Sequence, residues 1–459
     1  MTLPVQVLSP LDGRYHAAVS DLGEYLSEAG LNRARVQVEV EWLIYLTGHS
    51  MFGSAPLSAT NVDALRALVT DFGQVEIDEL AGLEATTRHD VKAVEYLVRH
   101  KLTELGLDNI AELTHFACTS EDINNLSYAL IVRDAVANVW MPAYRGVIAK
   151  LRELALTHRD EAMLARTHGQ PATPTTMGKE IAVFVFRLER IAAQIEANEY
   201  LGKFSGATGT FAAHLAADPT ADWAAISEEF VSGLGLSWNP LTTQIESHDW
   251  QAELYNKVSH ANRVLHNLAT DIWTYISMGY FRQIPQAGAT GSSTMPHKIN
   301  PIRFENAEAN LELSSAVLDS LAATLVTSRL QRDLTDSTTQ RNIGVGFGHS
   351  LLALDNIRRG LNEIDLDAVA LAADLDANWE ILGEAIQTVI RAEVSAGRSS
   401  ISDPYALLKE LTRGKRINRD DLVAFVATLE IGDEAKQRLL NLTPAGYAGM
   451  ASDLVRYLG

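Results

Sequence analysis

The sequence predicts an all-α fold, and two observations carry this prediction. Apolar residues recur at alternating steps of three and four along several long segments, and alternating β-branched runs joined by Asn-Gly turns are absent. Steps of three and four place an apolar stripe on one face of a helix, whereas a half-buried strand needs a period of two. Stripes sustained over such lengths indicate long helices that pack at shallow angles in a bundle.

Four segments show this periodicity most clearly, and the longest covers residues 254–275. Core packing explains most of each stripe. Several long stripes in one chain exceed what a single compact bundle buries, so we expect some of them to face other subunits. The stripe positions are Tyr144, Val147, Leu151 and Leu154; Ile181, Phe184, Leu188, Ile191 and Ile195; Leu254, Val258, Ala261, Leu265, Leu268, Ile272 and Tyr275; and Leu311, Ser314, Leu318, Leu321 and Leu325.

Two breaks in the helical pattern divide the chain into three predicted domains. One break lies near residues 105–112 and the other near residues 358–366. We therefore expect an N-terminal helical domain (1–110), a central long-helix bundle (111–360) and a C-terminal helical domain (361–459). At 459 residues the chain is long enough for more than one core.

The charge balance argues against nucleic acid and membrane partners. Lys plus Arg total 38 and Asp plus Glu total 58, which gives a formal net charge of −20. A field of that sign repels polyanions, although a local cluster of cations still binds a small anion. Cys118 is the only cysteine, which fits a reducing cytosol, and we interpret it as a small buried hydrophobe. We see neither a signal peptide nor a membrane-spanning run, and expect a cytoplasmic protein.

Polar segments interrupt the helical pattern at four places besides the loop described below. They read "DGRYHAAV" from residue 12, "TTRHDVKAVEY" from residue 86, "THFACTSEDINN" from residue 114 and "ARTHGQPATPTTMGKE" from residue 165. Each has a simpler interpretation alone: residues 119–122 resemble a helix N-cap, and His168 resembles a surface turn. Together they indicate a site formed between helices.

Metal and acyl-enzyme chemistry find no support in the motifs. The 13 histidines show no metal-ligand spacing, and no Gly-x-Ser-x-Gly elbow is present. We therefore expect no metal and no cofactor. The glycines of "GVGFGH" (344–349) lack the preceding strand of a phosphate loop, so we interpret them as sites of close helix packing.

The segment "ATGSSTMPHKINPIRFEN" (289–306), here called the signature segment, concentrates polar residues between prolines. Gly291 permits unusual backbone angles, and Lys298 brings a positive charge. Asn300-Pro301 is typical of a helix start, whose positive end favours anions. The residue types thus predict an anion-binding loop. We also expect it to be mobile when empty and ordered over substrate.

This segment carries a resemblance to a known family. "GSSTMPHKINP" resembles the signature of the fumarase/aspartase superfamily, whose members eliminate fumarate from succinyl compounds. "DGRY", "HDVKAVEY", "HFACTSEDINNLSYAL", "RTHGQPATPTTMGKE", "RLQRDLTDSTTQRN" and "LTRGKR" narrow the likeness to the bacterial form of the adenylosuccinate lyase family, nearly end to end. One departure is visible: this form usually has Asn where the chain has Arg88, an extra cation that affects nucleotide contacts.

The resemblance implies a fold, an assembly and a reaction. The fold would be the three-domain fumarase/aspartase-like one with a central long-helix bundle, in a homotetramer whose active sites are shared between subunits. The enzyme would split adenylosuccinate into AMP and fumarate, and likewise the succinylated aminoimidazole carboxamide ribotide, in de novo purine synthesis. Such an elimination needs a base, an acid at the leaving nitrogen, and donors aimed at the carboxylate.

The resemblance also assigns residues. Ser292 would be the general base and His168 the general acid, whereas His297 would only support them. A serine needs activation to act as a base, while imidazole titrates near neutrality. Substrate-binding positions would be Arg14, Tyr15, Arg88, His89, Asp90, Thr119, Ser120, Gln244, Ser293, Lys298, Asn300, Asn306, Arg332, Ser337 and Arg341.

Two alternatives remain open at the level of sequence. A sibling lyase acting on argininosuccinate, fumarate or aspartate would not need phosphate-binding arginines, and Arg332 and Arg341 would then form surface ion pairs. A non-catalytic helical scaffold on the same fold would need none of Ser292, His168 and Lys298, and the presence of all three argues against it.

Overall fold

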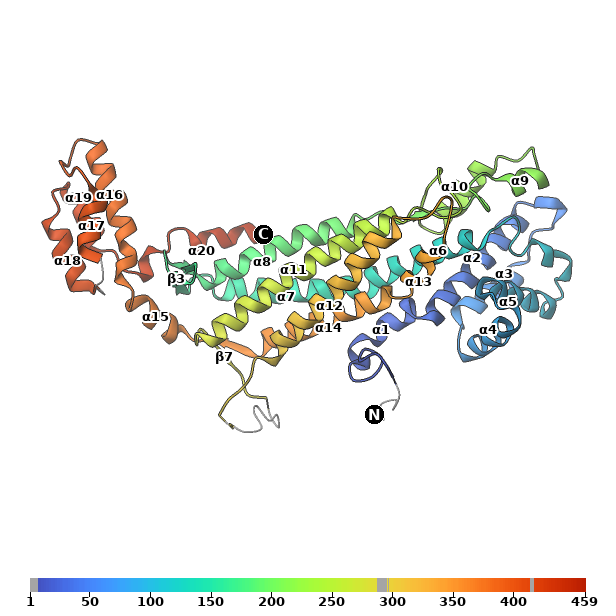
Figure 1. Cartoon of the computed structure of the whole chain (residues 1–459), viewed down its shortest axis with the longest axis horizontal. Coiled ribbons are helices and arrows are strands. Elements are labelled where there is room, and N and C mark those ends of the chain that lie inside the picture. The colour runs from blue at the N-terminus through green and yellow to red at the C-terminus, as the bar shows by residue number, and fades with distance from the viewer. Residues whose placement is uncertain (1–6, 287–294, 296, 413–416) are drawn as a thin grey trace. The chain divides into compact units, whose positions relative to one another are not determined.

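The computed structural model describes residues 7–286, 295, 297–412 and 417–459, and this part of the chain is predominantly helical (Figure 1). Its strands are two or three residues long and form four two-stranded pairings, β1–β4, β2–β3, β5–β6 and β7–β8. The predicted all-α class is therefore confirmed.

The chain divides into two compact units, each assembled from three stretches of sequence. The first unit comprises Met1–Arg145, Ile191–His266 and Ala307–Asp355. The second comprises Gly146–Arg190, Asn267–Asn306 and Asn356–Gly459. This division groups residues by contact and does not test the predicted three-domain boundaries, which stay a prediction.

The N-terminal part of the first unit has its own apolar core. Val36 and Val40 of α2, Leu65 of α3, and Val94 and Leu97 of α5 are buried together there.

The whole first unit contains further short elements besides those of this core. Its elements include α1 (His16–Leu26), α2 (Glu28–Gly48), α3 (Ala59–Thr70), α4 (Gln74–Thr87), α5 (Asp90–Glu104), α6 (Ser120–Ala135), the π-helical turn η3 (Val136–Trp140), β5 (Leu201–Gly202), α9 (Ala212–Ala217), α10 (Trp223–Gly233), β6 (Ser237–Trp238) and α13 (Thr335–Gln340).

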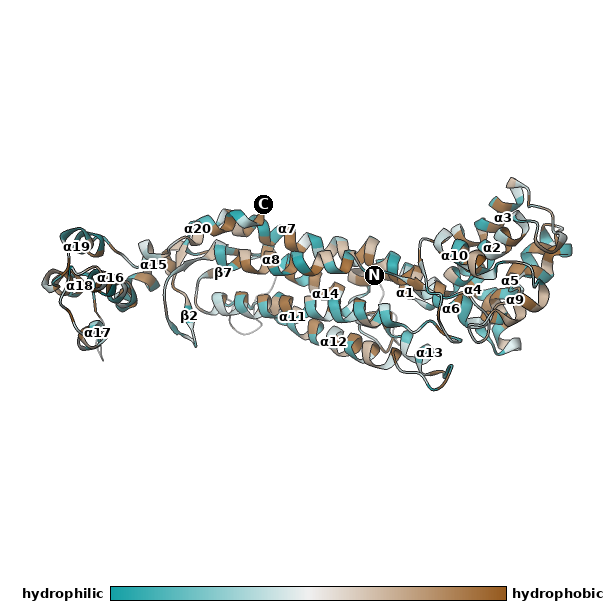
Figure 2. Ribbon diagram, turned by 90° about the horizontal axis from the view of Figure 1, so that it is seen from above, coloured by the Kyte–Doolittle hydropathy of each residue, from teal (hydrophilic) through white to brown (hydrophobic). Residues whose placement is uncertain are grey.

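The divisions between the units fall inside long helices, and these helices carry the predicted stripes. Figure 2 shows hydrophobic and hydrophilic residues alternating along them, as amphipathic helices require. Every stripe position is buried except Tyr275, which is half-buried. The helices are α7 (Met141–Thr157), α8 (Met177–Glu196), α11 (Asp249–Ser277), α12 (Ile302–Leu325) and α14 (Ile343–Asn362).

Within the first unit, α11, α12 and α14 lie side by side and share a buried chain of hydrogen bonds (Figure 1). Trp140 donates to Ser350 Oγ at 2.9 Å, and that hydroxyl donates to Asn262 Oδ1 at 2.8 Å. Asn262 Nδ2 donates to Ser314 Oγ, which in turn donates to the Gly346 carbonyl. Every member of the chain finds a partner, so these polar groups are buried without a desolvation penalty. The network also explains why a serine occupies the stripe of α12.

The glycines of α14 allow neighbouring segments to approach closely, as the sequence predicts. A Cβ added to Gly344 would lie 2.9 Å from the Leu26 carbonyl oxygen. One added to Gly346 would lie 2.9 Å from Leu318 Cδ2, and one added to Gly348 equally near Leu11 Cδ1. At Gly344 the short contact is to backbone, which cannot move aside easily, whereas at Gly346 and Gly348 a leucine side chain would have to shift. The glycines therefore serve close packing.

The second unit combines helix ends with short strand pairs and a C-terminal helical core. Leu382, Ile386, Ile390, Leu422 and Val426 are buried in that core. The elements are β1 (Ala162–Met163), β2 (Arg166–Thr167), β3 (Gln170–Pro171), β4 (Thr175–Thr176), β7 (Phe281–Gln283), β8 (Ile364–Leu366), α15 (Ala368–Asp376), α16 (Gly383–Ser395), α17 (Pro404–Thr412), α18 (Arg419–Thr428), α19 (Asp433–Leu440) and α20 (Ala451–Leu454).

Candidate active site

The start of α6 brings predicted residues of two segments together. Thr119 is the N-cap residue, and its N–H donates to Asp122 Oδ2 at 2.8 Å, so the helix-cap interpretation of this segment is correct. The first turn nevertheless presents the positive end of the helix. Ser120 Oγ lies 3.5 Å from His89 Nε2. His89 Nδ1 accepts the Lys92 N–H at 3.2 Å, which leaves Nε2 as the protonated, donating nitrogen of the neutral ring.

Arg332 lies against the same helix start. Its Nη2 is 2.9 Å from Glu121 Oε1, a carboxylate that is only 3% exposed. Nη1 donates to Gln244 Oε1, and Nη2 also donates to Ser337 Oγ, both at 3.3 Å. Its Nε is buried and has no hydrogen-bond partner among the described residues. Arg332 therefore contacts the predicted residues Gln244 and Ser337 together with Glu121, and keeps one donor unused.

Arg341 extends this cluster toward α5. It donates to the Ser337 carbonyl at 3.0 Å and to Asp90 Oδ2 at 3.3 Å. Asp90 also receives Arg35 Nη2 at 2.9 Å, and Arg35 Nε donates to Asn124 Oδ1 at the same distance. Asn124 donates to Glu121 Oε1 at 2.7 Å. The contacts thus close a ring, here called the arginine ring: Arg35, Asp90, Arg341, Ser337, Arg332, Glu121 and Asn124.

Three members of the arginine ring were given no binding role from the sequence: Arg35, Glu121 and Asn124. Glu121 and Asn124 stand in the polar segment that begins at residue 114, whereas Arg35 stands in none of the polar segments. A signal for Arg35 was present. It occupies a buried stripe of α2 that runs Leu31, Arg35, Val38, Trp42 and Leu46, and its side chain is 2% exposed. A cation on a core stripe needs a buried partner, because an unpaired buried charge is costly.

Carboxylates of the chain balance the cations of the ring. Burial raises the pKa of Asp90, but Arg35, the Val91 N–H and Arg341 lower it by more, so the net shift is downward. Asp90 is therefore charged at neutral pH. Arg341 also lies 3.5 Å from Glu28, so three arginines face Asp90, Glu121 and Glu28. The cluster offers directed donors for a small anion rather than a large positive field.

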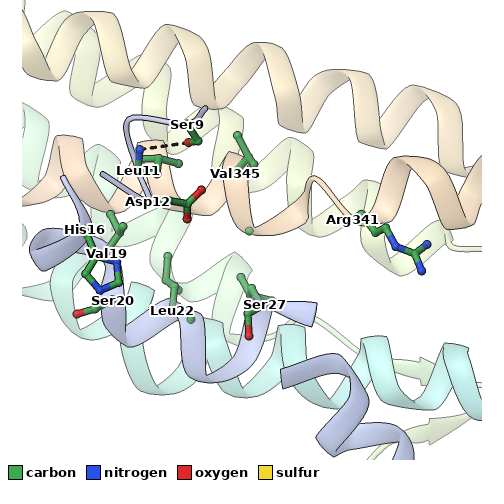
Figure 3. A pocket seen from close by; sticks show the side chains of 14 residues that line it. Ser9, Leu11, Asp12, His16, Val19, Ser20, Leu22, Ser27, Arg341 and Val345 are labelled. Carbon is green, nitrogen blue, oxygen red and sulfur yellow. Dashed lines mark hydrogen bonds between the residues drawn. The ribbon is translucent and has the colours of Figure 1, made fainter. Parts of the chain in front are cut away.

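A cavity adjoins Arg341 and reaches the segment that carries "DGRY". Its volume is about 310 Å³, and Figure 3 shows side chains of α1 on one wall and Val345 of α14 on another. Asp12 and His16, which flank Arg14 and Tyr15 in sequence, line it together with Arg341. Arg14 is exposed, its guanidinium 5.8 Å from the Tyr15 ring, and neither residue lines this cavity.

Arg88 ends α4 and is exposed. Its φ of 55° lies in the left-handed region, and its N–H donates to the Glu84 carbonyl at 2.7 Å. Asparagine tolerates this conformation better than other non-glycine residues. The Asn expected from the family would therefore suit the helix end, and its replacement by Arg88 carries a conformational cost.

His168 belongs to the second unit and lies at the tip of the β2–β3 hairpin. His168 and Gly169 form its two-residue turn with φ values of 54° and 73°, the left-handed conformation that fits the twist of a hairpin. The side chain is exposed and makes no hydrogen bond to the described part of the chain. The surface-turn interpretation is thus correct for its location, and the proposed acid is open to an incoming ligand.

The described part of the signature segment forms a turn followed by the start of α12. The Lys298 N–H donates to the Met295 carbonyl at 3.0 Å, and the Lys298 side chain is exposed. The Ile302 N–H donates to the Asn300 carbonyl at 2.8 Å as α12 begins after Pro301, as predicted. Asn306 is half-buried in α12. Ser292 and Ser293, and with them most of the predicted loop, lie outside the described residues.

Apart from Arg14, Tyr15 and Arg88, the predicted site residues that the structure describes therefore fall into two sets. The first unit brings His89, Asp90, Ser120, Gln244, Arg332, Ser337 and Arg341 into one connected cluster, with Thr119 beside it. The second unit holds His168, Lys298, Asn300 and Asn306 without a hydrogen bond between His168 and the other three among the described residues.

Among the described residues, no group of three or more His, Cys, Asp or Glu side chains is arranged to hold a metal ion. No helix in the described part of the chain is both long and apolar enough to cross a membrane. Burial raises the pKa of the Cys118 thiol well above its usual range, which disfavours the reactive thiolate.

Two solved structures share this fold over nearly the whole chain. The 3-carboxy-cis,cis-muconate lactonizing enzyme of Pseudomonas putida has a TM-score of 0.74 at 21% identity and covers 97% of each chain. The fumarate lyase of Mesorhizobium sp. BNC1 has a TM-score of 0.74 at 19% identity, covering 96% of this chain and 97% of its own. These likenesses establish the fumarase/aspartase type of fold, and no more than the fold.

Sequence comparison narrows the class. Residues 13–315 match the family model described as Lyase, so the sequence as well as the fold places the chain among the lyases. Residues 328–448 match the model of the adenylosuccinate lyase C-terminal region. Adenylosuccinate lyase of Escherichia coli (strain K12) is 48% identical over 98% of this chain and 97% of its own. That of Haemophilus influenzae is 46% identical over 98% of both. The chain belongs to the adenylosuccinate lyase family.

Proposed function

We propose that the protein is a carbon–nitrogen lyase that eliminates fumarate from adenylosuccinate, leaving AMP, in purine biosynthesis. It acts in the same way on the succinylated aminoimidazole carboxamide ribotide. One structural observation carries the proposal beyond family membership. Predicted ligand-binding residues from segments near positions 90, 120, 244 and 335 meet in one cluster whose donors suit a small polyanion.

The reaction needs a proton removed from the carbon beside a carboxylate while the C–N bond breaks. Ser292 takes that proton, and the electron pair forms the double bond of fumarate. His168 gives a proton to the departing nitrogen. Both products leave without added water, so the atoms balance. The exposed position of His168 at a hairpin tip supports the assignment, because an acid must reach a bound ligand.

The remaining predicted site residues bind the substrate. Arg332 and Arg341 contact the phosphate with His89, and the fork geometry of arginine suits a dianion. Lys298 serves the carboxylates of the fumarate moiety, where negative charge grows during proton removal. Thr119, Ser120, Ser293 and Asn300 assist there, and Arg14, Tyr15, Arg88, Asp90, Gln244, Asn306 and Ser337 contact or orient the nucleotide.

The assembly is a homotetramer in the cytoplasm, with active sites shared between subunits. One observation supports the oligomeric part of the proposal. The long helices expose large apolar side chains, such as Val183 and Phe186 on α8 and Leu313 on α12.

The experiment is direct. The protein is mixed with adenylosuccinate, and the ultraviolet absorbance is followed as AMP forms. We expect turnover by the wild type, and a loss of about 10²–10⁴-fold in kcat for Ser292→Ala and for His168→Ala with the oligomer intact. No AMP at high enzyme concentration would contradict the proposal and favour a sibling lyase or a scaffold. Near-wild-type turnover by either variant would contradict the role of that residue.

A further inference from the structure

The hairpin that carries His168 is held in place by a residue that the proposed mechanism does not use. Arg166 belongs to β2 and precedes the tip by two residues. The base of the hairpin is closed by pairing of β1 with β4 and by the Ala172 N–H, which donates to the Ala165 carbonyl at 2.9 Å. Beyond that base, residues 167–171 are exposed. Tertiary contacts must therefore set where the tip lies.

Arg166 provides such a contact. Its Nη1 donates to Tyr280 Oη at 2.9 Å, and its Nη2 lies 2.6 Å from Asp374 Oδ2. The Tyr280 hydroxyl donates to the same carboxylate oxygen, which completes a closed triad. Tyr280 is 1% exposed, while Arg166 and Asp374 are each about a quarter exposed. A planar guanidinium that binds two partners fixes orientation as well as distance.

The two partners of Arg166 lie next to β7 and β8, the strand pair from which the chain runs toward the signature segment. Tyr280 immediately precedes β7, and the sequence runs from β7 toward the signature segment. Gln283 at the end of β7 donates to the Ile299 carbonyl at 2.5 Å, so β7 contacts that segment at Ile299. Asp374 lies on α15, directly after β8, the partner strand of β7. All of these residues belong to the second unit.

We propose that Arg166 is a positioning residue that, through Tyr280 and Asp374, holds the His168 hairpin at a fixed place relative to β7. The inference rests on the proposed role of His168 as the acid. A general acid must lie within hydrogen-bond reach of its target, and a misplacement of about 1 Å costs about 100-fold in rate. The triad holds the hairpin so that His168 stays within hydrogen-bond distance of the ligand, and among the described residues its members make no hydrogen bond to the imidazole itself.

Conservative variants test the triad with little disturbance of packing. Tyr280→Phe removes only the hydroxyl, and Arg166→Lys keeps the charge but loses the planar fork that holds both partners in a fixed geometry. We expect each to lower kcat by about 10–100-fold while KM changes by less than about threefold. Asp365→Asn is the matched control, because it removes an exposed ion pair with Arg282 on the same β7–β8 ribbon. The control should keep the wild-type kcat.

A double-mutant cycle separates positioning from bracing of the fold. If Arg166 acts through His168, adding Arg166→Lys to His168→Ala lowers kcat by less than about twofold further. A residue that only stabilises the fold would lower kcat by the same factor in both backgrounds, and that result would overturn the proposal. So would a kcat for Arg166→Lys within about twofold of the wild type. Thermal unfolding of each variant identifies any loss of folded protein.

The cycle also distinguishes the two proposals. If His168→Ala keeps full turnover, the acid assignment fails, and the positioning role fails with it. If His168→Ala is inactive but Arg166→Lys and Tyr280→Phe are unimpaired, only the positioning role fails.

Discussion

At the scale of single residues, the orientation of a charged side chain in this protein depends on the group with which it pairs. Arg332 and Arg341 had a simple alternative interpretation as surface ion pairs. Arg332 is instead only 16% exposed and contacts the buried carboxylate of Glu121, whereas Arg341 is 44% exposed. An arginine held by a buried carboxylate is fixed in orientation, and this prepares it to meet an anion without rearrangement.

The pair of His115 and Glu39 predicts that the free energy of unfolding depends on pH near neutrality. His115 Nδ1 lies 2.5 Å from Glu39 Oε1, and Glu39 is fully buried. Burial lowers the pKa of His115, but the hydrogen bond and charge of Glu39 raise it by more, so the net shift is upward. A raised pKa means that the stabilisation is complete below the ordinary value of about 6.5 and is lost as pH rises through the folded value.

We therefore expect the free energy of unfolding to fall as pH rises above about 6.5, and His115→Asn to remove that slope. The variant should be destabilised most at low pH, because it leaves the buried Glu39 without its cationic partner. Urea unfolding of both proteins across this pH range measures the slopes. His260→Asn, at an exposed position of α11, is the control. Equal slopes in wild type and His115→Asn would contradict the assignment.

At the scale of elements, one helix terminus carries both structure and candidate function. Asp122 caps α6 and also contacts Lys203 at 2.8 Å, and both side chains are fully buried. Asp122 accepts the backbone N–H groups of Ser205 and Gly206 as well. The cap anchors the loop that leads toward Ala207, whose carbonyl accepts a hydrogen bond from Gln244. Asp122, which caps the start of α6, therefore also positions the loop next to Gln244, a contact of Arg332.

Glycine substitutions on two helices should change stability in opposite directions. In α14, Gly344→Ala places its Cβ 2.9 Å from the backbone oxygen of Leu26, so we expect a loss of about 1–3 kcal/mol. In α4, Gly82 has no heavy atom near its added Cβ, so Gly82→Ala should gain about 0.5–1 kcal/mol from reduced chain entropy. Denaturant unfolding of the two variants measures both. Equal effects would show that helix propensity outweighs packing.

At the scale of the whole molecule, net charge and local charge have different consequences. The net charge of −20 opposes binding of large polyanions, while the arginine ring concentrates three cations in one place. Carboxylates pair with these cations, so a phosphate competes with groups of the protein itself. Specificity then depends on where each donor points rather than on the total charge.

The proposed sharing of active sites between subunits predicts complementation. The variants His168→Ala, Ser292→Ala and Arg332→Ala, each inactive alone, are mixed in pairs and allowed to exchange subunits. We expect at least one pair to recover measurable turnover, because a mixed tetramer contains sites with no altered residue. The wild type carried through the same exchange is the control. If the exchanged wild type stays active and no pair of variants recovers turnover, each active site is built from one chain.

The sequence by itself determined the helices, the buried stripes and the kinds of residue at the candidate site. Helical periodicity and capping depend on neighbours a few positions apart, so α11, α12 and the cap of α6 could be predicted from it. The likeness of the signature segment to a family likewise depends on residues close together in the chain.

Only the tertiary structure decided which distant residues meet. It places Arg332 against Glu121 and Gln244, closes the arginine ring through Arg35, and joins Arg166 to Tyr280 and Asp374. These contacts arise where separate helices and loops pack together. Their geometry depends on how whole surfaces fit, and no local pattern of residues encodes that fit.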